Sequence, residues 1–151
     1  MPLMHRLSTF LIASAFAIAS SACGSSSPTT PTTTTPNSYA LLGKLSAAIN
    51  GVPQSRVHEF LLGSGATVSI TLASAIETML DGTTLSTVTL GVGLGTVTNG
   101  VCTVIPGAYV AVPSGTSAQM AWAMPQGTNC VKLSDVTVQE GPVAYTITMT
   151  Y

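Results

Sequence analysis

Charged residues are scarce in this 151-residue chain. Only 6% of its residues are charged, with 4 Lys and Arg against 5 Asp and Glu and a net charge of −1, whereas a soluble domain averages about 25%. No basic stretch is available to neutralise phosphates, which excludes a nucleic-acid-binding protein. The carboxylates do not follow the spacing of a calcium loop, and the chain has only 2 His. We therefore expect no metal and no cofactor.

Sequence patterns of catalytic sites are missing as well. No serine lies in a G-x-S-x-G nucleophile elbow. The glycine run from Gly91 to Gly95 opens no helix, so it predicts a twisted or bulged strand rather than a phosphate-binding loop. His58 alternates onto the same face as Phe60 and Leu62, which predicts a packed, hydrogen-bonded histidine at the edge of a core. We expect the protein not to be an enzyme.

The first 22 residues have the pattern of a secretory signal peptide. A short start containing Arg6 is followed by an apolar run from Phe10 to Ala19 and then by small residues. That run is shorter than the roughly 20 apolar residues that a membrane-spanning helix needs. The segment therefore predicts export of the chain.

Cys23 follows the signal peptide in the context Ser20-Ser21-Ala22-Cys23-Gly24. This context resembles a bacterial lipobox, with Ser20 where leucine is usual, and implies lipidation of Cys23. The alternative is ordinary cleavage after Ala22, but a free thiol is a liability in an oxidising compartment. Ser25 stands where an inner-membrane lipoprotein carries aspartate, so the resemblance implies the outer membrane or the cell surface of a bacterium.

A tether of residues 23–38 separates this cysteine from the folded part. Its sequence is rich in Ser, Thr and Pro, and Pro28, Pro31 and Pro36 are incompatible with regular helices and sheet ladders. Such a segment stays solvated and partly extended. We expect one folded domain, over residues 39–151.

In that domain apolar residues recur with a period of two, which is typical of half-buried strands. The clearest case is the last segment, where Val143, Tyr145, Ile147 and Met149 alternate with threonine and alanine. Asn50-Gly51, Asp81-Gly82 and Asn99-Gly100 are turn signals. About eight strands are predicted, near residues 40–49, 56–62, 66–73, 85–94, 97–104, 108–112, 117–124 and 129–136, with the last of these merging with 143–151.

The segment from Leu72 to Leu80 is predicted to hold one helical turn. Otherwise many short strands with Gly and Pro turns, and no helical intervals, indicate an all-β chain. The expected fold is an antiparallel β-sandwich of the jelly-roll or immunoglobulin-like kind.

Two cysteines remain when Cys23 is lipidated, and an exported chain favours a disulfide between them. These are Cys102 and Cys130. The rival interpretation is a two-thiol metal site, for which no further ligands are found in the sequence.

Two aromatic residues could contact a ligand. Trp122 shares its strand face with Met120 and Met124, which predicts core packing. Tyr109 alternates with Ala108 and Val110 and is therefore left on the other face. Tyr109 is the one candidate ligand contact in the sequence.

The folded segment also resembles the bacterial pre-peptidase C-terminal domains, small sandwiches appended to secreted proteins. The resemblance rests on segments 43–46, 57–60 and 66–72, and on the closing pattern of 127–131, Asp135 and 143–148. The acidic Asp-x-Asp-Leu segment usual in that family is missing, and residues 86–90 stand in its place. The resemblance implies a noncatalytic sandwich and assigns no site residue.

Together these patterns predict a lipid-anchored, exported β-sandwich that acts as a binding or adhesion module of the cell envelope. Its expected partners are the membrane, through the lipid, and a glycan or another envelope protein. The alternatives are an envelope enzyme or inhibitor with a site assembled from distant strands, and a purely structural envelope component whose strand edges pair with neighbours.

Overall fold

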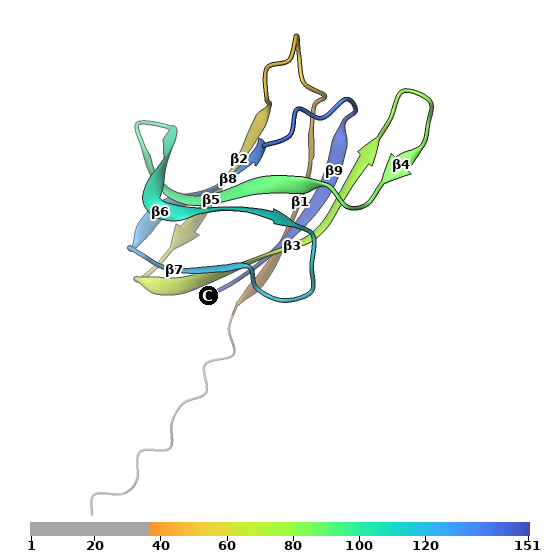
Figure 1. The fold of residues 1–151 in the computed structure, drawn as a ribbon. Helices are drawn as coiled ribbons and strands as arrows, with labels where there is room; N and C mark the ends of the chain where they lie inside the picture. Colours follow the sequence, from red (N-terminus) through yellow and green to blue (C-terminus); the bar gives the residue numbers. More distant parts are fainter. Residues whose placement is uncertain (1–36) are drawn as a thin grey trace, which may run out of the picture. The chain divides into compact units, whose positions relative to one another are not determined.

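The period-two pattern produces two antiparallel sheets packed face to face, as expected for a β-sandwich (Figure 1). The computed structural model describes residues 37–151. This range contains nine strands and no helix. They are β1 (Ser38–Leu45), β2 (Ser55–Leu62), β3 (Ala66–Thr78), β4 (Thr84–Leu85), β5 (Thr89–Thr98), β6 (Val101–Pro113), β7 (Met120–Met124), β8 (Gly127–Asp135) and β9 (Val143–Thr150).

One sheet has five strands and the other has four. The five-stranded sheet has the order β1-β9-β3-β4, and β7 also pairs with β3, near the start of that long strand. The four-stranded sheet has the order β2-β8-β5-β6. Every strand pair is antiparallel. The prediction of an antiparallel sandwich is therefore confirmed.

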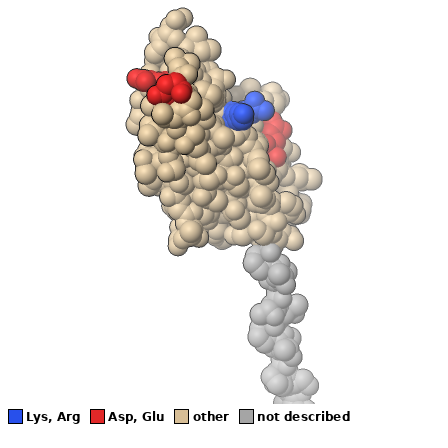
Figure 2. All heavy atoms as spheres, turned by 90° about the vertical axis from the view of Figure 1, so that its right-hand side faces the viewer, with Lys and Arg blue, Asp and Glu red and all other residues tan. Residues whose placement is uncertain are grey.

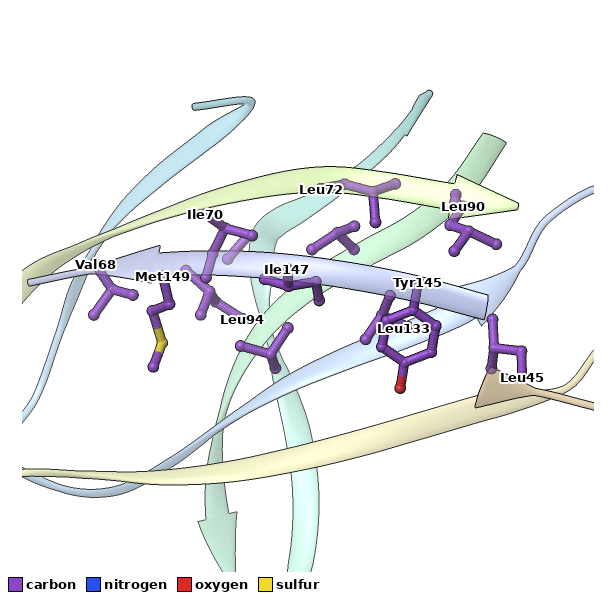
Figure 3. Close-up of a cluster of buried hydrophobic side chains, with 14 of the residues drawn as sticks. Leu45, Val68, Ile70, Leu72, Leu90, Leu94, Leu133, Tyr145, Ile147 and Met149 are labelled. Carbon is purple, nitrogen blue, oxygen red and sulfur yellow. The ribbon is translucent and has the colours of Figure 1, made fainter. Parts of the chain in front are cut away.

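The core lies between the two sheets and is built by alternation along each strand (Figure 3). In β9 the inward residues Val143, Tyr145, Ile147 and Met149 are at most 2% exposed, while the residues between them are partly exposed. Leu90, Val92 and Leu94 of β5 and Val131 and Leu133 of β8 meet them from the opposite sheet. Burial of this apolar surface is the main term that stabilises the fold.

Two predicted strand boundaries are wrong. The segments 129–136 and 143–151 do not merge, because β8 and β9 belong to different sheets and the chain crosses between the sheets over residues 136–142. Conversely, 101–104 and 108–112 are parts of one strand, β6, while the first two residues of the predicted strand 97–104 end β5 and the next two form the turn. The register of β6 against β5 shifts between Gly93 and Gly95, so the β6 segment between Val104 and Tyr109 bulges without breaking the strand.

The predicted helical turn over residues 72–80 is also wrong. β3 continues as a strand to Thr78, with an irregularity in its pairing between Leu72 and Ser74. The extra residue there changes which positions face inward: Leu72 is buried, and then Ala75 and Glu77 are buried in place of 74 and 76. This bulge places a carboxylate, Glu77, on the inner side of the sandwich.

The turn signals and the glycine run behave as predicted. Asn50 and Asn99 have φ of 53°, and Gly51 and Gly100 have φ of 74°, as tight hairpin turns require. The glycine run lies within β5, at the register shift described above. It is part of a strand, as predicted, but the extra residues of the bulge belong to β6 and not to β5.

A disulfide joins Cys102 of β6 to Cys130 of β8, as predicted. These two strands flank β5, and the bridge passes beside Gly95 of β5, where a Cβ would lie 3.0 Å from the Cys130 sulfur. The bridge closes a loop with a sequence separation of 28. On the chain-entropy account a loop of this size stabilises the fold by about 3–4 kcal/mol.

The domain has two ends that differ in what they carry. At the end called proximal here, Asn37 and Tyr151 lie side by side, joined by backbone hydrogen bonds of 2.8 and 3.1 Å. At the end called distal, segments 46–54, 79–88 and 136–142 meet; Ala48 N donates to Gln139 O at 3.0 Å and Thr78 N donates to Pro142 O at 3.0 Å. Residues 37–151 contain no helix of the length and hydropathy that would cross a membrane.

Candidate functional site

His58 forms a hydrogen-bonded pair with Tyr145 across the gap between the sheets. The half-buried His58 side chain of β2 faces inward with Phe60 and Leu62, as predicted. Its Nε2 lies 2.7 Å from the hydroxyl oxygen of Tyr145, and the two rings meet edge to face at 5.8 Å. Gly43 of β1 makes this contact feasible, because a side chain there would overlap the Tyr145 ring.

Both members of this pair are neutral at pH 7. Burial lowers the pKa of His58, and the positive charge of Arg56 lowers it further. Burial raises the pKa of Tyr145, and Arg56 opposes that shift. Within residues 37–151 the only side-chain hydrogen bond of His58 is the one to Tyr145. No serine or carboxylate in this part of the chain joins it to form a triad.

Tyr109 lies over the glycines of β5, on the outer face of the four-stranded sheet. A side chain at Gly91 would overlap the Tyr109 hydroxyl, and a Cβ at Gly93 would lie 3.2 Å from its ring. The hydroxyl is 3.2 Å from Ser134 Oγ, and the side chain is 49% exposed. Tyr109 therefore covers strand backbone that has no side chains of its own, and its role as a ligand contact stays a prediction.

The remaining residues singled out in the sequence are placed as follows. Trp122 is partly buried and packs against the core cluster, as predicted, and it also covers Gly107. Cys23 lies outside the described residues. Within these residues no group of three or more His, Cys, Asp or Glu side chains is placed to hold a metal ion.

A small polar pocket at the distal end was not predicted from the sequence. Its volume is about 180 Å³, and its lining includes Glu77, Leu85, Thr87, Thr89, Thr137 and Gln139. Glu77 is 4% exposed and Gln139 is 7% exposed. The pocket therefore contains a carboxylate and an amide that are both almost completely removed from bulk water.

The hydrogen bonds around this pocket leave two oxygen atoms without a partner. Glu77 Oε1 accepts from Gly141 N at 2.7 Å, and Gln139 Nε2 donates to Thr137 Oγ1. Within residues 37–151 neither Glu77 Oε2 nor Gln139 Oε1 has a hydrogen-bond partner. The one fully enclosed side-chain oxygen without a partner in that range is Asn129 Oδ1. The two pocket oxygens are therefore open to the pocket.

Asp135 shows the opposite arrangement, although it is buried to the same degree. It is 4% exposed, and its two oxygens accept from Thr137 N at 3.0 Å and Gln139 N at 2.8 Å. These bonds fold segment 136–142 around the carboxylate, with Val138 at a φ of 57°. Asp135 thus holds the loop in place with both of its oxygens, whereas Glu77 uses only Oε1 and leaves Oε2 without a partner in the described residues.

A second hollow, of about 410 Å³, lies on the outer face of the five-stranded sheet near the distal end. Its rim is formed by Leu42, Lys44, Ser74, Ile76 and Thr146, over the small residue Ala144. Leu42 is 71% exposed and Ile76 is 40% exposed. This hollow is mostly apolar, and Lys44 is the one charged residue of its lining.

Six of the eight charged residues of the described part lie towards the distal end. Figure 2 shows one face, on which the charged atoms lie in the upper part and the lower part is uncharged. Lys44 is the last residue but one of β1 and Arg56 is the second residue of β2, whereas Glu59 and Lys132 lie near the middle of their strands. The distal acidic residues are Glu77, Asp81, Asp135 and Glu140.

Comparison of this chain with protein families, with curated proteins and with solved structures returns no match.

Proposed function

We propose that the protein is an exported, lipid-anchored β-sandwich that binds a component of the bacterial cell envelope through its distal end and performs no catalysis. The expected partner is a glycan or another envelope protein, and the membrane is reached through lipid on Cys23. The sequence resemblance to pre-peptidase C-terminal domains is in keeping with a noncatalytic appended sandwich.

The observation that carries this proposal is the difference between the two ends of the domain. The chain enters at Asn37, at the proximal end, where the tether of residues 23–38 would connect it to an anchor. Six of the eight charged residues of the described part lie towards the opposite end, where the polar pocket and the apolar hollow are found. The proximal end also has a hollow, of about 340 Å³, but no charged side chain lines it. A domain tethered in this way presents its charged end to whatever lies beyond the membrane surface.

The anchor is tested by metabolic labelling of the full chain with palmitate in a bacterial host. We expect label in the wild-type chain and none in Cys23→Ser, which should leave the membrane fraction. Label that is unaffected by Cys23→Ser would contradict the lipid anchor.

The binding end is tested with the unlipidated Cys23→Ser chain, so that attachment cannot come from the lipid. Cosedimentation with isolated cell envelopes should be reduced by Lys44→Glu, which reverses the charge beside the apolar hollow. The matched control is Lys132→Glu, the same change near the middle of β8. Equal binding by the two variants would overturn the assignment of the distal end.

A further inference from the structure

Two buried side chains line the distal pocket, and each has one oxygen that is open to the pocket and has no donor among the described residues. Glu77 and Gln139 are both more than nine-tenths buried, and Glu77 Oε2 and Gln139 Oε1 are unpartnered within residues 37–151. Burial of a charged or polar group without a partner is unfavourable, and buried charges are normally paired. No Lys, Arg or His side chain of the described residues pairs with Glu77. The two open oxygens can therefore accept hydrogen bonds from a ligand that enters the pocket, and the carboxylate of Glu77 favours a cationic one.

The chemistry of the lining restricts what can supply that donor. The unpartnered atoms are a carboxylate oxygen and an amide oxygen, and threonine residues surround them. An anion is excluded by the carboxylate. A calcium ion takes six to eight oxygen ligands, usually from several carboxylates, and the second buried carboxylate of this region, Asp135, already accepts two backbone N–H bonds. A group with one positive charge and several N–H donors fits this set best.

We propose that the distal pocket binds the ammonium group of a primary amine. The ammonium group donates to Glu77 Oε2 and Gln139 Oε1. Its carbon chain leaves along Leu85, which is the exposed one of the two apolar lining residues, Leu85 and Val88. The pocket volume of about 180 Å³ admits the ammonium group and a few methylenes. Such a group is carried by a lysine side chain of a partner protein and by free amines, which share this chemistry. This inference names the chemistry of the ligand that the distal end binds, and it therefore rests on the proposed function.

The test is a titration of the ¹⁵N-labelled full chain carrying Cys23→Ser with n-butylammonium chloride, followed by NMR. We expect saturable shifts of the backbone amides of Thr87, Thr89 and Gln139. Glu77→Gln keeps an oxygen for the Gly141 N–H bond but removes the charge, and it should weaken binding at least about tenfold. The matched control is Glu140→Gln, the same change at an exposed position of the neighbouring loop, which should leave the affinity unchanged.

A second variant and two other probes complete the test. Thr87→Val removes a hydroxyl group from the pocket lining and should reduce the affinity for butylammonium. Because Thr87 is exposed, the change should not affect the fold, so the result does not depend on Glu77→Gln alone. Tetramethylammonium, which has the charge but no N–H donor, should not bind. Equal affinity of the wild type and Glu77→Gln, shifts confined to other surfaces, or tighter binding of calcium ions at these amides would overturn the proposal.

The sources of the amine are distinguished by a lysine-containing peptide and by its lysine-acetylated form. Binding of the unmodified peptide alone, at higher affinity than butylammonium, indicates a protein partner, whereas equal affinities indicate a free amine. Because this titration is done in solution, it fails or succeeds independently of the palmitate and envelope-binding experiments.

Discussion

His58 shows how one residue is constrained by its neighbours. It lies on the inner side of β2, accepts or donates a single hydrogen bond at Tyr145, and is close enough to Arg56 for the guanidinium charge to oppose its protonation. Protonation of His58 in the folded protein would place two positive charges side by side in a half-buried region. The residue therefore stabilises the sandwich in its neutral form.

This arrangement predicts a pH dependence of stability. The pKa of His58 is lowered in the folded protein, so below about pH 6.5 the unfolded chain binds the proton first. The free energy of unfolding should be highest above that pH and fall as the pH is lowered towards the folded-state pKa. Urea unfolding at a series of pH values between 8 and 5 measures this. His58→Gln should flatten the profile, and an unchanged slope in that variant would contradict the prediction.

At the scale of the element, β5 is built around glycines that its neighbours cover. Tyr109 lies over Gly91 and Gly93, and the backbone of Thr103 and the disulfide lie over Gly95. Side chains at these positions would separate β5 from the segments that cover it. The glycine run therefore has a packing function, since it lets the covering residues of β6 and the Cys102–Cys130 bridge lie close to the backbone of β5.

Gly95→Ala should destabilise the domain, because its Cβ would overlap the carbonyl oxygen of Thr103, which is backbone and cannot rotate away. We expect a loss of about 1–3 kcal/mol in the free energy of unfolding. Gly63→Ala is the matched control, because its Cβ would meet nothing within 4 Å, and it should change the stability by less than about 0.5 kcal/mol. Urea unfolding of the two variants checks this, and equal effects would contradict it.

At the scale of the whole molecule, one core holds two sheets together. β9 and β3 lie inside the five-stranded sheet, β8 and β5 lie inside the four-stranded sheet, and their inward residues belong to one cluster. The edge strands β1 and β2 and the short β4 contribute fewer buried side chains. Opening of the centre of either sheet therefore requires the whole core to separate.

Hydrogen exchange should show this hierarchy. The amides of β9, β3, β8 and β5 should exchange at similar, slow rates that follow global unfolding, whereas β4 and segment 46–54 should exchange much faster. Mass spectrometry of the exchanging full chain measures the rates. Central strands of the two sheets that exchange at widely different rates would show that the sheets unfold separately, contrary to this account.

Much of the fold could be predicted from local patterns. The alternation in β9, the Asn-Gly turns and the inward side of β2, with His58, depend on residues close in the sequence. The disulfide could also be predicted, because only Cys102 and Cys130 remain when Cys23 is assigned to lipidation. The positions of Trp122 against the core and of the glycine run within a strand follow from the same period of two.

Tertiary structure alone decided the location of the candidate site. With strict alternation after Leu72, Glu77 would face outward and Ile76 inward, but the bulge in β3 reverses the two. Segment 136–142 then closes over Glu77 through Gly141 and Asp135. A bulge arises from pairing with strands that are distant in the sequence, so no local pattern predicts it. For this reason the amino-acid pattern determined the sandwich and its turns, whereas the pairing of distant strands decided which carboxylate is buried beside a pocket.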